Sequence, residues 1–262
     1  MHKISVLLIT MPLILLFTAN CKDQRPKSPM PMVDGNTKTM ILYIGTYTEN
    51  ESHVEGKATG VYLYRLNESE GTLAYLSVSP PTVNPSYVAV HPSGNWIYTV
   101  NETAKASGNP GSISVFRLRD HGTKMEYLHS VPSEGDYPCY IQVDHSGKFV
   151  MAANYGSGTV AMWPINKDGS LGPVVSTDQH TGKGPTSRQE SAHAHMITPS
   201  PDNRFVYSCD LGTDMIYIYR LDTLDRKLLP AGNPYHTIPG AGPRHLTFHP
   251  KGKYAYVINE LN

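Results

Sequence analysis

Short apolar runs separated by polar turns make up the chain from about residue 40 onward. Four segments share one pattern, in which an apolar strand, a polar turn and a second strand ending in Asn or Asp follow one another. The segments recur roughly every 50 residues, a period typical of repeat proteins. Their sequences are NPSYVAVHPSGNWIYTVNE, YPCYIQVDHSGKFVMAANY, HAHMITPSPDNRFVYSCDL and GPRHLTFHPKGKYAYVINE.

Further β-prone runs lie between these segments, so each repeat contains about four predicted strands. Examples are GVYLYRL, GSISVFRL, GTVAMWPI and DMIYIYRL. Helical periodicity is absent from this region. Four-stranded units at a period of about 40 to 50 residues predict a β-propeller. The predicted fold class is therefore all-β, with a three-stranded start, three full repeats and half of another, or about four and a half blades.

The repeat count raises the question of how the propeller closes. A propeller with open ends exposes a blade face and a sheet edge. The sequence ends at YVINELN, in or just after the second strand of a repeat, and the first repeat lacks one strand. We therefore expect the sequence to be a fragment from which several C-terminal blades are missing.

The N-terminal residues 1–20 have the features of a signal peptide. MHK carries a positive charge, and the apolar run ISVLLITMPLILLF contains Pro12 and is short for a membrane span. The run ends at TANC, which is similar to the lipobox of bacterial lipoproteins, although Asn20 departs from the usual small residue. We predict an exported protein, either periplasmic or anchored to the outer membrane through lipidated Cys21. A plain secretory signal is the alternative.

The next residues, 21–39, are polar and proline-rich and predict a disordered tether, which leaves 40–262 for the partial propeller. The chain has 22 basic and 22 acidic residues without a long run of either, so we predict no nucleic-acid partner. Its 17 tyrosines and many Gly and Pro residues favour strands and turns. Cys139 and Cys209 form no CxxC motif, and we expect both to be free and mostly buried.

The repeats provide an internal test for functional residues, because a purely structural position should hold similar residues in each repeat. Six positions before the shared turn, two repeats carry Ser86 and Cys139, whereas the next two carry His195 and Arg244. In the usual order of propeller strands, this position begins a strand near the central channel. A scaffold does not require His in one repeat and Arg in the next. We therefore predict that His195 and Arg244 face a ligand.

A second set of equivalent residues ends the following strand. Its members share an amide or a carboxylate, which predicts hydrogen bonds to the backbone of turns; they are Asn101, Asn154, Asp210 and Asn259. The residues directly after them differ; they are Glu102, Tyr155, Leu211 and Glu260. We take Glu102, Asn154 and Tyr155 as candidate substrate-binding residues, although a Glu at the end of a loop is often simply solvated.

Arg188 is a further candidate for substrate binding. It lies in HTGKGPTSRQE, a Gly-rich polar segment that leads into the histidines. This segment would either lie over the mouth of the channel and bind an anionic group, or form an exposed loop between blades.

His193 and His195 lie on the same side of a regular strand, because side chains alternate along it. Three interpretations stay open. The histidines could be hydrogen-bonded structural residues, they could act in catalysis, or they could supply two metal ligands with a third from Glu190 or Asp210. We predict no metal site and no cofactor.

Several motifs occur together in this chain, among them YIGTYT, ANYGSGTVAMWPI, HAHMITPSPDNRFVYSCDLG and GPRHLTFHPKGKYAYVINEL. In combination they resemble the lactonase family with a seven-bladed β-propeller, over residues 40–262. This family includes the propeller-type bacterial 6-phosphogluconolactonase and the fungal carboxymuconate-lactonizing enzyme. The resemblance implies seven blades, of which roughly two and a half would be absent here.

The resemblance also implies an active site. In the fungal member, a His, an Arg and a Glu of these blades, with a later Arg, have been proposed as the catalytic residues. Those motifs correspond here to the His-x-His pair, with His195 favoured over His193, and to Arg244 and Glu260. The later Arg would lie in the region that we expect to be missing.

Such a set of side chains suits the opening of a lactone ring. A neutral His or a Glu can accept the proton of an attacking water, and Arg244 can pair with the developing oxyanion. No Gly-x-Ser-x-Gly nucleophile motif occurs after residue 40, which argues against a covalent serine route.

We predict a lactone hydrolase whose partner is a small-molecule lactone, with 6-phosphoglucono-1,5-lactone as the best named substrate. An unphosphorylated aldonolactone fits the predicted export better. Formation of a lactone from a muconate-like acid is a second possibility. A third is a non-catalytic propeller that binds a ligand or a protein at the cell surface, because propellers have many functions.

Overall fold

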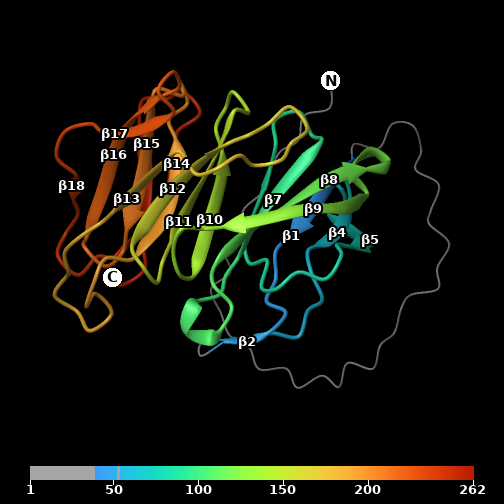
Figure 1. Ribbon diagram of the computed structural model, residues 1–262, viewed down its shortest axis with the longest axis horizontal. Coiled ribbons are helices and arrows are strands. Elements are labelled where there is room, and N and C mark those ends of the chain that lie inside the picture. The colour runs from blue at the N-terminus through green and yellow to red at the C-terminus, as the bar shows by residue number, and fades with distance from the viewer. Residues whose placement is uncertain (1–38, 52–53) are drawn as a thin grey trace.

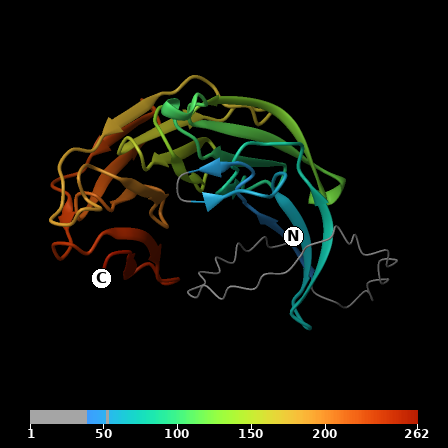
Figure 2. The same ribbon diagram turned by 90° about the horizontal axis from the view of Figure 1, so that it is seen from below.

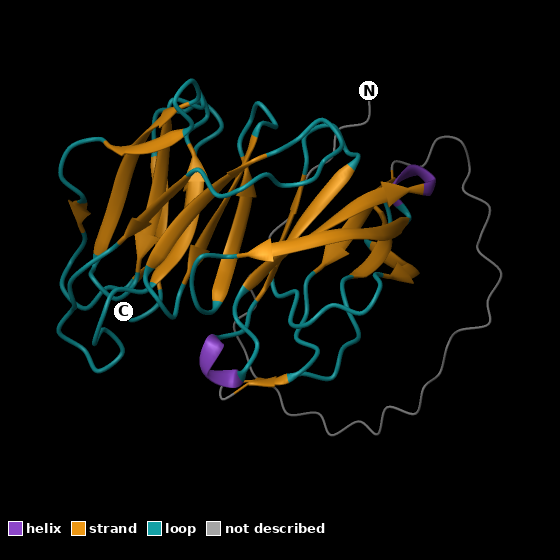
Figure 3. Cartoon of the chain, in the orientation of Figure 1, coloured by secondary structure: helices purple, strands orange, loops and turns teal. Residues whose placement is uncertain are grey.

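The computed structural model describes residues 39–51 and 54–262 of the chain. The predicted signal peptide, Cys21 and all but the last residue of the predicted tether lie outside the described residues. Strands dominate the described part, whose helices are two short 3-10 turns, η1 (Lys105–Ser107) and η2 (Asp120–Gly122) (Figure 3). The prediction of an all-β fold is confirmed.

The first three sheets follow the predicted repeats, and neighbouring strands in each are antiparallel. The first sheet has the order β1-β4-β5 and contains β1 (Thr39–Ile44), β4 (Tyr62–Asn67) and β5 (Thr72–Val78). The second contains β6 (Val88–Val90), β7 (Trp96–Asn101), β8 (Ser112–Arg119) and β9 (Lys124–Pro132). The third contains β10 (Pro138–Val143), β11 (Phe149–Asn154), β12 (Thr159–Pro164) and β13 (Ser176–Gln179).

The fourth sheet and a final hairpin complete the set of four and a half predicted blades. The fourth sheet contains β14 (Ala194–Pro199), β15 (Phe205–Asp210), β16 (Met215–Asp222), β17 (Lys227–Pro230) and β18 (Tyr235–His236). The hairpin consists of β19 (Pro243–Phe248) and β20 (Ala255–Asn259). A separate small hairpin near the start of the chain pairs β2 (Asn50–Glu51) with β3 (Val54–Glu55).

The short strand β18 is the one strand of the fourth sheet that the repeat pattern does not predict. It exists because β17 pairs only with the later part of β16, from Tyr219 to Asp222. The earlier residues Met215 and Ile216 keep a free edge, and β18 returns to pair with them.

The sheets follow one another along an open arc, from the first sheet in blue to the last hairpin in red (Figure 2). Figure 1 shows β14 of the fourth sheet beside β10 to β12 of the third. The first strands of successive repeats, β6, β10, β14 and β19, contact one another directly. These inner strands are therefore the ones that begin near the centre of the arc, as predicted.

Apolar cores fill the spaces between neighbouring sheets. Strand β11 illustrates the arrangement, because all of its residues are buried. Val150 and Ala152 pack with the second sheet, while Met151 and Ala153 pack with the fourth. Alternate side chains thus bury both faces of the sheet, and each fully buried large side chain contributes about 1.5–3 kcal/mol.

The turns that join the first two strands of each repeat are also linked between sheets. Asp144 accepts N–H bonds from Lys148 at 2.7 Å and Phe149 at 2.8 Å within its own turn. Its carboxylate also accepts a bond at 2.8 Å from the side-chain amide of Asn203, in the turn of the next sheet. Asp144 therefore closes one turn and attaches it to its neighbour.

Cys139 and Cys209 are free, as predicted; Cys209 is buried and Cys139 is half-buried. In residues 39–51 and 54–262, no helix is long and apolar enough to cross a membrane.

Candidate active site

The predicted ligand-facing position lies at an irregularity in three of the inner strands. The strand pairing skips one residue between Pro138 and Tyr140 in β10, and does so at the equivalent places in β14 and β19. The skipped residues are Cys139, His195 and Arg244. A bulge of this kind leaves a residue unpaired and redirects its side chain. The predicted ligand-facing position is thus a structural feature of the repeat, and its residue type varies from blade to blade.

His195 is 7% exposed, and its ring lies among aromatic rings. The centroid of the Tyr155 ring is 5.7 Å away and that of His245 is 5.2 Å away, both edge-on. Burial, and then the positive charge of Arg244, hold the pKa of His195 well below its usual range. The ring is therefore neutral at neutral pH. Its Nδ1 atom is buried and has no hydrogen-bond partner among the described residues.

His193 is fixed on one side of its ring. Its Nδ1 donates to the carbonyl oxygen of Tyr155 at 2.9 Å, and the two rings stack with centroids 4.4 Å apart. The other ring nitrogen, Nε2, lies 3.3 Å from Oε1 of the exposed Glu190. His193 can therefore offer Nε2 to a ligand or share it with a carboxylate.

Arg244 and Glu260 form an ion pair, and Arg188 joins it from the preceding loop. Arg188 donates to Glu260 at 2.7 Å and to the Tyr155 hydroxyl at 3.3 Å. Burial raises the pKa of Glu260, but the bonds and charges of the two arginines outweigh it and hold that pKa below its usual value. Two guanidinium groups thus share one carboxylate, and this group of three carries a net positive charge.

Glu102 occupies the equivalent place in the second sheet and is 8% exposed. The hydroxyl of Ser86 donates to its carboxylate. Burial, and then the charge of Glu102, raise the pKa of Tyr47. Cys139 feels the charges of both Glu102 and Arg244. Burial, and then the charge of Glu102, raise the pKa of its thiol, whereas the charge of Arg244 lowers it. The thiol is therefore protonated and unsuited to act as a nucleophile.

Asn154 departs from the prediction that it binds substrate. Its side chain is fully buried, and its amide donates to the carbonyl oxygen of Ser133 at 2.9 Å and to Oγ1 of Thr159 at 3.0 Å. A side chain enclosed in this way cannot contact a ligand in the channel. It has the structural role that the shared amide of the repeats predicts, so we leave it out of the site.

Neither of the suggested third metal ligands completes a group with both histidines. Asp210 is fully buried and bound to His180, and Glu190 is exposed beside His193. Throughout the described residues, no three His, Cys, Asp or Glu side chains are grouped so that they could hold a metal ion.

A cavity of about 660 Å³ lies next to the bulges, along the inner strands. Its walls include Tyr87, Tyr140, Met196 and His245, each one position after a bulge or its equivalent, together with the exposed side of β20. Neither His195 nor Arg244 lines it. The cavity is mainly apolar, and we therefore place the chemistry at the bulges, where charged and titratable side chains meet.

Comparison with known proteins agrees with this fold. A family model described as "Lactonase, 7-bladed beta-propeller" matches residues 41–262. The chain belongs to this lactonase family. The 6-phosphogluconolactonase of Bacillus subtilis is 37% identical over 222 residues, and that of Formosa agariphila is 28% identical over 224. These alignments cover 85% and 84% of this chain.

A solved lactonase-like structure, the periplasmic gluconolactonase of Pseudomonas aeruginosa, is 32% identical with a TM-score of 0.75. It aligns with 85% of this chain, and the alignment covers 62% of the gluconolactonase. The chain likewise spans 60% of the length of the Bacillus protein and 62% of the Formosa protein.

The structure brings together most of the candidate site residues expected from sequence. His193, His195, Tyr155 and the Arg188–Glu260–Arg244 group form one continuous set of contacts. Glu102 follows β7 and lies beside Ser86, just before the inner strand β6 of the second sheet. Sequence reasoning missed His245, whose pKa burial and Arg244 lower to about 4. The signal was present, because His245 directly follows Arg244 in GPRH.

Proposed function

We propose that this chain forms part of a lactone hydrolase that opens sugar lactones. The observation that carries the proposal is that the neutral, buried His195 and the positively charged Arg188–Glu260–Arg244 group both adjoin Tyr155. The first component can accept a proton, and the second can stabilise an anion. Both are needed when water attacks an ester carbonyl.

In the proposed reaction, water attacks the carbonyl carbon of the lactone while His195 accepts one of its protons. The carbonyl oxygen takes the electron pair and becomes an oxyanion beside Arg244. Collapse re-forms the carbonyl and breaks the bond to the ring oxygen, which receives the proton from the imidazolium. The product is a hydroxy acid, which releases one proton at neutral pH.

We propose 6-phosphoglucono-1,5-lactone as the substrate to test first. Two arginines around one carboxylate leave a positive charge that suits a phosphate, and two relatives are named 6-phosphogluconolactonase. Unphosphorylated gluconolactone is the second candidate. It is favoured by the predicted signal peptide and by the name of the periplasmic relative. Export, with or without lipidation of Cys21, belongs to the same proposal.

The test measures proton release from both lactones by the full chain, in the presence and absence of a chelator. We expect turnover that resists the chelator and falls by about 100-fold or more in His195→Ala and Arg244→Ala. His193→Ala, measured in parallel, shows which imidazole accepts the proton. The exposed residues His121 and Arg204 provide control variants, His121→Ala and Arg204→Ala, which should retain full activity.

Three results would contradict parts of the proposal. Full activity in His195→Ala and Arg244→Ala would exclude this site. Loss of activity with the chelator would support a metal instead. Absence of turnover together with saturable binding of gluconate would favour a binding module.

A further inference from the structure

Behind the proposed site, the sheets differ at two further positions. One follows the last strand of a sheet, and the other ends the second strand of the next sheet. The residue that follows the last strand of each blade donates its backbone N–H to the start of the third strand. This residue is Ser79 in the first sheet, Ser133 in the second and His180 in the third; the acceptors are the carbonyls of Val61, Gly111 and Gly158. The third sheet thus carries a fully buried histidine where the first two carry serine; in the fourth sheet the corresponding residue is Thr237, after β18, which donates its N–H to the carbonyl of Asp214.

The partner position changes together with it. In the third sheet, Asn154 donates its amide to the carbonyl of Ser133 at 2.9 Å. In the fourth sheet, the equivalent residue is Asp210, whose Oδ2 lies 2.8 Å from Nδ1 of His180. The side chains of His180 and Asp210 are both completely buried. A bond from a buried Asn amide to a backbone carbonyl is therefore replaced by a side-chain bond between His180 and Asp210 at the boundary that precedes His193 and His195.

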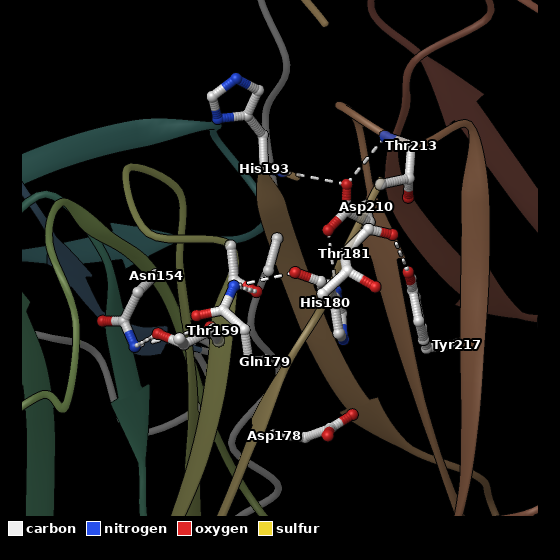
Figure 4. A network of polar contacts seen from close by, with 12 residues as sticks. Asn154, Thr159, Asp178, Gln179, His180, Thr181, His193, Asp210, Thr213 and Tyr217 are labelled. Atoms are coloured by element: carbon white, nitrogen blue, oxygen red, sulfur yellow. Dashed lines mark hydrogen bonds and ion pairs between the residues drawn. The ribbon is translucent and has the colours of Figure 1, made fainter. Parts of the chain in front are cut away.

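The second oxygen of Asp210 holds the backbone of the site. Its Oδ1 accepts the N–H of His193 and the N–H of Thr213, each at 3.0 Å (Figure 4). In the neighbouring sheets the corresponding N–H groups have other acceptors: that of Asn84 bonds to Thr48 and that of Tyr137 to the carbonyl of Thr103.

The backbone conformation at this point differs as well. The residues equivalent to His193 have positive φ angles in the other sheets: Asn84 has 38°, Tyr137 has 51° and Gly242 has 60°. His193 has no positive φ. The chain therefore enters β14 by a different route, and the carboxylate of Asp210 accepts its N–H on that route.

His180 is itself fixed from two further sides. Its ring stacks on Tyr217, with centroids 3.6 Å apart, and its Nε2 lies 2.8 Å from the Tyr219 hydroxyl. That hydroxyl also donates to Asp178 at 2.7 Å. The imidazole cannot turn without breaking these contacts, so it holds Asp210 in one orientation.

We propose that His180 and Asp210 are positioning residues for the site. They fix the backbone of His193 through its N–H. The position of the His193 ring against Tyr155, and that of His195 in the bulge two residues later, depend on this backbone. Neither residue touches the substrate. This inference rests on the proposed lactone hydrolysis for its kinetic readout, but its structural readout is independent of activity.

The test compares His180→Asn with His180→Leu in the full chain. The two replacements are similar in size, but only Asn can donate to Asp210 in place of Nδ1. We expect His180→Leu to lower kcat by roughly 10- to 100-fold, the scale of a small misplacement of a catalytic group. KM should stay within about twofold, and His180→Asn should retain kcat within about threefold.

The structural readout is the imidazole nitrogen spectrum of His193. Its Nδ1 donates to Tyr155 in the unmodified chain, so the neutral ring should show a protonated Nδ1. His180→Leu should yield a mixture of tautomers, and His180→Asn should keep the original one. If the unmodified chain turns over no lactone, the proposed function fails while these spectra still decide the inference.

A double variant, His180→Ser with Asp210→Asn, restores the pair of the neighbouring sheet. An amide oxygen accepts a hydrogen bond more weakly than a carboxylate oxygen, and Oδ1 of Asn154 has no partner among the described residues, so the N–H of His193 should be held less firmly in the double variant. We expect a folded protein with the kinetic and spectral changes of His180→Leu. Unchanged kcat and unchanged His193 spectra in His180→Leu, or in the double variant, would overturn the proposal.

Discussion

The charge of His195 decides how this side chain can act. Burial first, and Arg244 second, lower its pKa. The folded pKa lies below the unfolded value of 6.5, so folding favours the neutral ring. The contribution of His195 to the free energy of unfolding is therefore fully present above pH 6.5 and is lost as the pH falls through the folded pKa. We expect the imidazole nitrogens of His195 to show no titration between pH 8 and pH 6.5 when followed by NMR.

Replacing Arg244 by Gln removes the second cause and leaves the first. The midpoint of the His195 titration should therefore rise, but it should remain below 6.5. The exposed Arg204→Gln serves as a control with the same loss of charge elsewhere and should not move it. A midpoint at or above 6.5 in the unmodified chain would contradict the assignment of a neutral base.

Comparison between repeats predicted His195 and Arg244, because a single strand position carried unlike residues. The same comparison could not find His180, since the residues after the last strands align only once the sheets are seen. Asp210 was taken as one of four structural residues, and its carboxylate does bond to backbone. Its difference from the three asparagines has a meaning only beside His180, which lies 30 positions earlier in the chain.

The turn at Asp144 shows how one element connects to the next. Burial raises the pKa of Asp144, but its hydrogen bonds, first those from Ser146 and Asn203, outweigh burial. The pKa is therefore below its usual value. We expect Asp144→Ala to reduce the free energy of unfolding by about 1–3 kcal/mol at neutral pH, because two sheets lose a shared acceptor. Urea unfolding measures this. The folded pKa is depressed, so the stabilisation is present above 3.8 and declines as the pH falls through the folded value.

Asp168 provides the matched control for that turn. It accepts bonds from Ser170 within its own turn at 3.0 Å and 2.6 Å, and it is exposed. Asp168→Ala should leave the unfolding midpoint close to that of the unmodified chain. An equal loss in both variants would mean that the connection between Asp144 and Asn203 contributes nothing beyond a single turn.

At the scale of the whole molecule, alternation of apolar residues and turn spacing were enough to predict an all-β propeller with about four strands in each repeat. They were sufficient because sheets packed between neighbours bury both faces, as β11 does, so similar apolar strands recur in each repeat. Strand β18 escaped prediction, since it depends on the unequal lengths of β16 and β17. Packing against a neighbour, which no local pattern encodes, decides such details.

The last hairpin leaves an apolar face uncovered. Ile258 is 52% exposed, whereas the equivalent Val100 and Ala153 are fully buried between sheets, and Tyr256 beside it is 56% exposed. An uncovered apolar face of this kind promotes association, and a formal net charge of +0 offers no repulsion. The protein made of these 262 residues should therefore self-associate with rising concentration in sedimentation velocity. Ile258→Lys should shift it toward the monomer, whereas Leu224→Lys, at a 91% exposed turn residue, should not. Equal behaviour of the two variants would exclude this face as the contact.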